Sequence, residues 1–194
     1  MTRDALRQQL RASRRALTTE ARLKASISAA MKLCESAAYR DARRIAVYLA
    51  MDGELDPTPL VMRARTDGRE VYLPVLPPLD GPMSFRLYLP DSKLANNRFG
   101  IPEPVSAEGG RTAKEMDLVV TPLVGFDMQG NRLGMGAGFY DRTFGFLRHM
   151  QKPHPLLIGY AYEFQKVPAL SAEEWDVPLA GVATEQQFYP RPAS

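Results

Sequence analysis

The chain has little of the chemistry that cysteine and histidine provide. Its 194 residues include one cysteine, Cys34, and two histidines, His149 and His154. A single cysteine excludes an internal disulfide framework and a cysteine-rich zinc site, so we expect Cys34 to be a core thiol in a reducing cytoplasm. We expect both histidines to lie outside the functional site, so the sequence predicts no Ser–His–Asp or Cys–His catalytic arrangement.

Long apolar runs and the common nucleotide-binding motifs are missing too. No stretch approaches the roughly 20 apolar residues of a membrane span, and the N-terminus lacks the apolar core of a secretory signal. The P-loop pattern GxxxxGK[ST] does not occur. Glycines 134, 136 and 138 alternate instead of following GxGxxG, and they lie far along the chain. We therefore expect no membrane segment, and a nicotinamide dehydrogenase is disfavoured.

The composition is that of one globular domain. Hydrophobic residues make up 45% of the chain and charged residues 24%, and the length predicts a single domain over residues 1–194, which we expect to be a monomer. The net charge is only +3, but the first 24 residues hold seven basic residues against two acidic ones. Nucleic-acid binding would explain that basic segment. The rest of the chain is nearly balanced and has no recognition motif, so we expect no nucleic-acid partner.

The basic segment predicts an amphipathic helix over residues 3–17. At about 100° per residue, its arginines at positions 3, 7, 11 and 14 fall within an arc of roughly 80°, beside a stripe of leucines. A solvated helix face usually mixes charges of both signs. A row of arginines without carboxylates therefore indicates that an anion binds there, although a solvated basic face fits the pattern equally well.

Helical and strand patterns alternate along the remaining chain. Further helices are predicted at 19–38, 57–65 and 140–150, strands at 43–51, 69–76, 83–90, 117–127, 154–162 and 181–189, and a loop-rich stretch at 91–116. This order predicts an α/β fold, a single three-layer α/β/α domain around a mostly parallel sheet, Rossmann-like. Ligands of such sheets bind beyond the carboxyl ends of the strands. The segments YLAMDGELD and GNRLGMGAGFYDR follow two such strands, and together they form the candidate site.

The segment GNRLGMGAGFYDR, residues 130–142, has the groups that bind a phosphate. Its alternating glycines let backbone N–H groups approach an anion closely, and it leads into a predicted helix N-terminus. Arg132 adds a planar bidentate donor, and Asp141 is placed to hold a magnesium ion. A purely structural turn explains the glycine spacing as well, so both interpretations stay open on spacing alone.

The segment VVTPLVGFDMQGNRLGMGAGFYDR resembles the signature of the 5-formyltetrahydrofolate cyclo-ligase family, also called methenyltetrahydrofolate synthetase. The similarity continues in chain order through DALRQQLRASRRAL, YLAMDGELDPTPLV, GREVYLPVL, MSF, FGIPEP and IGYAYEFQKVPALSAEEWDVPLAGVATE. It implies that the chain uses ATP and Mg²⁺ to convert 5-formyltetrahydrofolate to 5,10-methenyltetrahydrofolate. The folate and ATP are then its small-molecule partners.

The resemblance also implies which residues form the site. The implied ATP-binding residues are Arg3, Asp4, Ala5, Leu6, Arg7, Arg132, Leu133, Gly134, Met135, Gly136, Ala137, Gly138, Phe139 and Tyr140. The implied folate-binding residues are Leu49, Met51, Glu54, Met135, Gly136, Ala137, Gly138 and Phe139. Arg132 and Tyr140 are implied to be catalytic, and Asp141 and Asp176 to be magnesium ligands.

Four positions depart from the family pattern. Met135 and Ala137 have no side-chain donor for phosphate, Arg3 replaces a frequent lysine, and Ala180 stands where an aspartate is frequent. These departures leave two other functions to be weighed. One is an α/β enzyme that binds a sugar phosphate or an acyl-CoA, and the other is a folate or nucleotide binder without catalysis.

Overall fold

A seven-stranded sheet forms the centre of the computed structural model, which describes residues 2–79, 81–106, 109–150 and 153–192. Its strand order is β11-β10-β9-β6-β1-β2-β3. The five inner strands run parallel, and the two edge strands run antiparallel to their neighbours. These strands are β1 Arg44–Ala46, β2 Glu70–Val75, β3 Ser84–Leu87, β6 Leu118–Pro122, β9 Leu156–Tyr160, β10 Gly181–Ala183 and β11 Phe188–Pro190. The predicted mostly parallel α/β sheet is confirmed.

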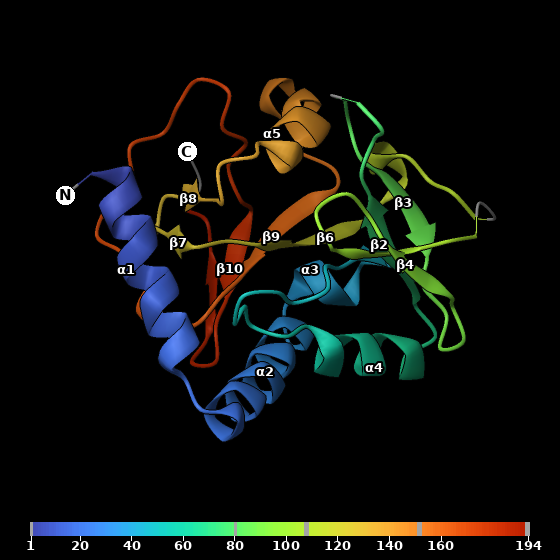
Figure 1. Cartoon of the computed structure of the whole chain (residues 1–194), viewed down its shortest axis with the longest axis horizontal. Helices are drawn as coiled ribbons and strands as arrows, with labels where there is room; N and C mark the ends of the chain where they lie inside the picture. The colour runs from blue at the N-terminus through green and yellow to red at the C-terminus, as the bar shows by residue number, and fades with distance from the viewer. Residues whose placement is uncertain (1, 80, 107–108, 151–152, 193–194) are drawn as a thin grey trace.

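Helices cover both faces of this sheet, which gives the predicted three layers (Figure 1). One face packs against α2 (Thr19–Cys34), α3 (Ala37–Arg40) and α4 (Thr58–Thr66). The other face packs against α5 (Phe139–Phe144) and the 3₁₀ helices η1 (Ala113–Glu115) and η2 (Gly145–His149). Along each strand, alternate side chains enter the two cores, as with Ile45 and Ala46 of β1. No helix among the described residues is long and apolar enough to cross a membrane.

The helix α1 (Arg3–Ala16) lies at the side of the molecule, against a small hairpin (Figure 1). The hairpin pairs β7 (Gly125–Phe126) with β8 (Arg132–Leu133). Its buried residues Val124 and Leu133 pack with Leu10 of α1, and Leu6 lies beside them. The predicted amphipathic helix is thus confirmed, since its leucines pack on the hairpin.

Several predicted elements are divided in the structure. The helix predicted at 19–38 stops at Cys34, because Ser36 accepts the N–H of Tyr39 and so caps a separate α3. The strand predicted at 117–127 ends at Pro122, which has no N–H for a longer ladder. The strand predicted at 181–189 is a hairpin, because Thr184 accepts the N–H groups of Gln186 and Gln187 in a turn.

Three further boundaries differ from the prediction. The stretch 91–116 is not only loop, since it contains η1 and a hairpin of β4 (Leu94–Asn96) and β5 (Pro102–Pro104). The predicted strand 43–51 pairs over only three residues and continues as an extended segment, and the helix predicted at 140–150 continues as η2 after Phe144. The short 3₁₀ helix η3 (Glu163–Gln165) completes the structure.

Candidate active site

A cavity of about 530 Å³ opens at the carboxyl ends of the neighbouring strands β1 and β6. From β1 the chain continues to β2 on one side, whereas from β6 it continues to β9 on the other. The segments just after β1 and β6 therefore diverge, and this is where α/β sheets bind ligands. The cavity is lined by Tyr48 and Leu49 after β1 and by Pro122 and Leu123 at the end of β6. The two segments expected to form the site, after β1 and before α5, thus line one cavity.

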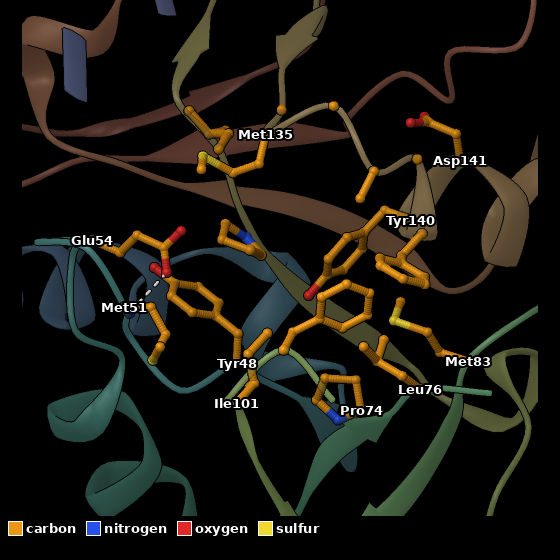
Figure 2. A pocket seen from close by; sticks show the side chains of 18 of the residues that line it. Tyr48, Met51, Glu54, Pro74, Leu76, Met83, Ile101, Met135, Tyr140 and Asp141 are labelled. Atoms are coloured by element: carbon orange, nitrogen blue, oxygen red, sulfur yellow. Dashed lines mark hydrogen bonds between the residues drawn. The ribbon is translucent and has the colours of Figure 1, made fainter. Parts of the chain in front are cut away.

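One part of the cavity is apolar. Figure 2 shows side chains of Pro74, Leu76, Met83 and Ile101 gathered on one wall, with Tyr48 beside them. Most of this wall comes from the end of β2 and from the β4–β5 hairpin, which lies in the stretch predicted to be loop-rich. The hairpin also reaches the glycine loop, because Phe99 and Phe139 lie edge to face with ring centroids 5.8 Å apart.

Glu54 is a carboxylate that lines the cavity, and its side chain lies near Tyr48 and Met51 (Figure 2). Its Oε2 accepts the N–H of Met51 at 3.0 Å, and its Oε1 lies 3.9 Å from Nη1 of Arg14. Burial raises the pKa of Glu54, although the Met51 hydrogen bond and the Arg14 charge oppose that shift. Glu54 is therefore a partly buried hydrogen-bond acceptor beside the apolar wall, and we call this part of the cavity the apolar slot.

Tyr140 extends into the cavity from the opposite wall, at the start of α5 (Figure 2). Burial raises the pKa of its hydroxyl, and the charge of Glu54 raises it further. The hydroxyl therefore stays protonated at neutral pH and can donate a hydrogen bond inside the cavity.

The glycine loop forms another wall of the cavity and ends at the N-terminus of α5, as predicted. Gly136 and Gly138 have φ values of +101° and +67°, and the latter caps the helix, so the backbone itself favours glycine at both positions. Gly134 has no such requirement, and a Cβ atom placed there would meet nothing within 4 Å. The space beside Gly134 is therefore open, and a side chain at this position would narrow the cavity.

Three arginines line the cavity near this loop, namely Arg3, Arg7 and Arg132. Nε of Arg7 donates to the carbonyl of Gly134 at 2.9 Å and so attaches α1 to the loop. Arg132 is only 8% exposed, and its guanidinium donates to the carboxylate of Asp141 and to the carbonyl of Val177. The arginines predicted to bind phosphate are thus already held in place by protein partners.

The two carboxylates predicted to bind magnesium lie on the same side of the cavity. Both line it, and Asp141 accepts the N–H of Val177, the residue that follows Asp176, at 3.1 Å. Their hydrogen bonds within the protein use Oδ1 of Asp141 and Oδ2 of Asp176, so each carboxylate keeps an oxygen for a cation. Within the described residues no group of three acidic, histidine or cysteine side chains forms a metal site. Two carboxylates fit Mg²⁺, which takes its other ligands from phosphates and water.

Four of the residues implied by the resemblance do not line the cavity. Leu133 is fully buried against α1, and Leu6 packs beside it. Ala5 is exposed, and Asp4 is exposed and pairs with Arg7. The three residues of α1 lie away from the cavity because only one side of this helix faces it, and Leu133 of β8 lies away because its side chain packs on α1. The other implied residues, including Leu49, Met51, Met135 and Ala137, do line it.

The arginine stripe of α1 has a protein partner that the sequence pattern did not reveal. Asp52 accepts from Nε of Arg11 at 2.8 Å, from Nη2 of Arg14 at 3.0 Å and from Nε of Arg15. Arg14 is fully buried and also donates to the backbone carbonyl of Asp52 at 3.2 Å. The anion expected along this face is thus partly a carboxylate of the chain itself, and only Arg3 and Arg7 lie at the cavity. Asp52 adopts a left-handed conformation, φ 51°, which short polar residues tolerate best.

Comparison with known proteins identifies the family. The chain matches the model of the 5-formyltetrahydrofolate cyclo-ligase family over residues 1–185. It is 41% identical to the 5-formyltetrahydrofolate cyclo-ligase of Escherichia coli K12 over 182 residues, which cover 93% of this chain and 98% of that protein. It is 39% identical to the enzyme of the same name from Haemophilus influenzae over 179 residues, 91% of this chain and 94% of the relative.

Solved structures agree with this match. The fold is similar to the NMR structure of Aquifex aeolicus 5,10-methenyltetrahydrofolate synthetase, with a TM-score of 0.82 and 29% identity over 100% of this chain and 95% of that one. The Mycoplasma pneumoniae 5,10-methenyltetrahydrofolate synthetase shares the fold, with a TM-score of 0.74 and 24% identity over 95% and 99% of the two chains. The chain, with its cavity between an apolar slot and a glycine loop, therefore belongs to the 5-formyltetrahydrofolate cyclo-ligase family and is an enzyme of that family.

Proposed function

We propose that this enzyme converts 5-formyltetrahydrofolate to 5,10-methenyltetrahydrofolate and consumes ATP with Mg²⁺ to form ADP and phosphate. The observation that carries the proposal is one cavity with two chemically different walls. An apolar slot with one buried carboxylate, Glu54, adjoins a glycine loop with Arg3, Arg7 and Arg132. The slot suits a flat heterocycle with N–H donors, and the loop suits a triphosphate.

The chemistry explains why both ligands are needed in one cavity. A formyl oxygen is a poor leaving group, so we propose that it first attacks the γ-phosphorus of ATP and that the bond from that phosphorus to ADP breaks. The formyl carbon becomes an N5-iminium carbon that carries phosphate. The lone pair of N10 then attacks this carbon, the carbon–oxygen bond breaks, phosphate leaves, and N10 loses its proton. Positioning and charge stabilisation dominate in such transfers.

Each wall of the cavity then has a distinct task. Glu54 accepts hydrogen bonds from pterin N–H groups, while Tyr48, Leu49 and Met51 enclose the ring. The neutral hydroxyl of Tyr140 donates a hydrogen bond that orients the formyl group. Arg132 stabilises the charge of the transferred phosphoryl group, and the backbone N–H groups of residues 134–138 bind the phosphates. Asp141 and Asp176 would hold Mg²⁺, which would neutralise phosphate charge.

One coupled measurement tests this function. ADP release is followed with and without 5-formyltetrahydrofolate, together with the absorbance of the methenyl product. We expect ADP release that depends on the folate and equals product formation. A folded protein that binds the folate but releases no ADP would be a binder without catalysis. Binding of phosphate esters without any ATP turnover would instead indicate a sugar-phosphate or CoA enzyme, and either result would overturn the proposal.

A further inference from the structure

Trp175 is the only tryptophan of the chain, and it stands at the cavity. It is 61% exposed, although its neighbours in sequence, Asp176 and Val177, take part in the site. Among the described residues no aromatic ring or cation lies against its indole. A large indole face left uncovered beside a cavity is a surface on which a planar ligand can stack.

The turn that carries Trp175 is held firmly in place. Within it, the N–H of Asp176 donates to the carbonyl of Glu173 at 3.0 Å, and Oδ2 of Asp176 accepts the N–H of Glu173 at 3.0 Å. Arg148 of η2 donates to the carbonyl of Glu174 at 2.9 Å. Arg3 of α1 donates to the carbonyl of Ser171 at 2.8 Å. Bonds from two different elements therefore fix the position of Trp175 relative to the cavity.

The neighbours of Trp175 indicate which part of a ligand it meets. It directly precedes Asp176 and lies in the segment bound by Arg3, both of which belong to the phosphate side. The residues proposed for the pterin follow β1 instead and include the buried Tyr48. The base is the one flat hydrophobic part of a nucleotide. If the phosphates lie on the glycine loop, the base is therefore the part that can stack on an aromatic side chain at the rim of the cavity.

We propose that the indole of Trp175 stacks on the base of the bound nucleotide and is its main base-binding residue. This inference rests on the proposed function, since it needs ATP in the cavity. Stacking on an aromatic side chain accepts any base, so Trp175 supplies affinity for a nucleoside triphosphate rather than selectivity for adenine.

The first test uses tryptophan fluorescence, excited at a wavelength that the eight tyrosines do not absorb, so the signal comes from Trp175, the single tryptophan. With Mg²⁺ present, ADP and inorganic tripolyphosphate are compared, because the second has phosphates but no base. We expect ADP to change the emission of the wild-type protein. Tripolyphosphate should compete with ADP in calorimetry yet leave the emission nearly unchanged. An equal emission change with both probes would overturn the inference.

The second test uses the variants Trp175→Ala and Trp175→Phe. The side chain is mostly exposed, so we expect both to fold, which thermal unfolding checks. Removing an aromatic platform weakens binding of one base by roughly tenfold or more. The Kd of ADP should therefore rise about tenfold in Trp175→Ala and remain close to the wild-type value in Trp175→Phe. The Kd of tripolyphosphate should not change in either variant.

Phe164→Ala is the matched control, since Phe164 is a 38% exposed aromatic residue in a different surface groove. It should bind ADP like the wild type. The inference is overturned if Trp175→Ala binds ADP as tightly as the wild type. It is also overturned if this variant raises the KM of the folate and leaves the Kd of ADP unchanged. Neither result would contradict the proposed function. Failure of the wild-type protein to bind ADP at all would overturn the proposed function as well, so the two failures are distinguishable.

Discussion

At the scale of single residues, the cavity holds its charges in pairs. The guanidinium of Arg132 is almost fully buried and has the Asp141 carboxylate as its partner. A buried charge without a partner costs several kcal/mol, and this pairing offsets that cost. In the proposed function, phosphate binds Arg132 and Mg²⁺ binds Asp141, so both ligands compete with the contact between these two side chains. Their mutual pairing therefore also orients both groups before the ligand arrives.

Replacing Asp141 by asparagine tests this arrangement. The variant Asp141→Asn keeps an oxygen that accepts the N–H of Val177 but loses the charge that faces Arg132 and the cation. We expect kcat/KM for Mg-ATP to fall about 100-fold, whereas the loss of stability is smaller, because the asparagine oxygen can still accept a hydrogen bond from Arg132. Steady-state kinetics and calorimetry measure the two effects. A large loss of stability with a matching loss of activity would show that Asp141 only supports α5.

Glu54 gives a prediction for pH. Burial raises its pKa above the ordinary value of 4.5, and only the ionised form accepts two pterin N–H donors. We therefore expect the KM of the folate to increase as the pH falls toward this raised pKa, earlier than an exposed carboxylate would allow. In Glu54→Gln the KM should be about tenfold higher at neutral pH and independent of pH across this range. An unchanged KM of Glu54→Gln at neutral pH would show that Glu54 does not bind the folate.

At the scale of elements, long periodic segments were predictable and short ones were not. The helix that became α1 and the strands that became β2 and β9 carry clear patterns, and each was predicted within about two residues. The β4–β5 and β7–β8 hairpins have strands of three and two residues, too short for any periodic pattern. Their existence depends on tertiary contacts, such as the packing of Leu133 on α1.

The glycine loop allows a test that separates ligand binding from folding. Gly134 has an ordinary φ and open space where a Cβ atom would lie, so Gly134→Ala should not change the thermal midpoint. If phosphate occupies that space, the added methyl group should raise the KM of ATP about tenfold or more. Gly68→Ala is the control, since Gly68 has φ +69° in the turn after α4. That variant should lose about 1 kcal/mol of stability and keep its KM.

The arginine cluster around Asp52 connects α1 to the segment that carries Glu54. Desolvation acts to raise the pKa of Asp52, but the hydrogen bonds from Arg15 and Arg11 outweigh it and lower the pKa to about 2. A carboxylate whose pKa is lower in the folded state stabilises the protein above its unfolded pKa of 3.8. That stabilisation is lost as the pH falls from about 4 to 2.

Asp52→Asn should therefore reduce the free energy of unfolding at pH 7 by about 2 kcal/mol. The difference from the wild type should shrink below pH 4, which denaturant titrations at several pH values would measure. Glu20→Gln is the control, because its pair with Lys24 is fully exposed on α2 and contributes little. A constant difference between wild type and Asp52→Asn from pH 7 to pH 2 would contradict the role of the charge.

At the scale of the whole molecule, the sheet topology unites residues that are distant in sequence. The predicted alternation of strands and helices was enough to place the segments after β1 and before α5 at one sheet edge, where the cavity is found. The apolar wall from Pro74 to Ile101 was not predicted. Its residues lie in GREVYLPVL, MSF and FGIPEP, which resemble family segments but were assigned no binding role. The Asp52 cluster was missed for a different reason, since arginines 11 and 14 were expected to bind a ligand anion, whereas in the structure they pair with Asp52.

Because residues of α1, of the sheet and of α5 all line this cavity, we expect the chain to unfold as one domain and to be stabilised as one. Calorimetry should show a single transition for residues 1–194. Mg-ADP at about 100 times its Kd should raise the midpoint by roughly 5–10 °C, corresponding to about 2.7 kcal/mol of binding free energy. Two separate transitions, of which only one responds to the nucleotide, would contradict the single domain.

The position of α1 has a consequence for the order in which the chain is made. Its leucines pack on the β7–β8 hairpin, and Arg7 bonds to Gly134, 127 residues further along the chain. A growing chain thus carries this first helix with its apolar side uncovered until most of the protein has left the ribosome. Such late, long-range contacts slow folding and leave apolar surface exposed meanwhile. The five arginines of α1 keep that uncovered helix charged, which opposes self-association during synthesis.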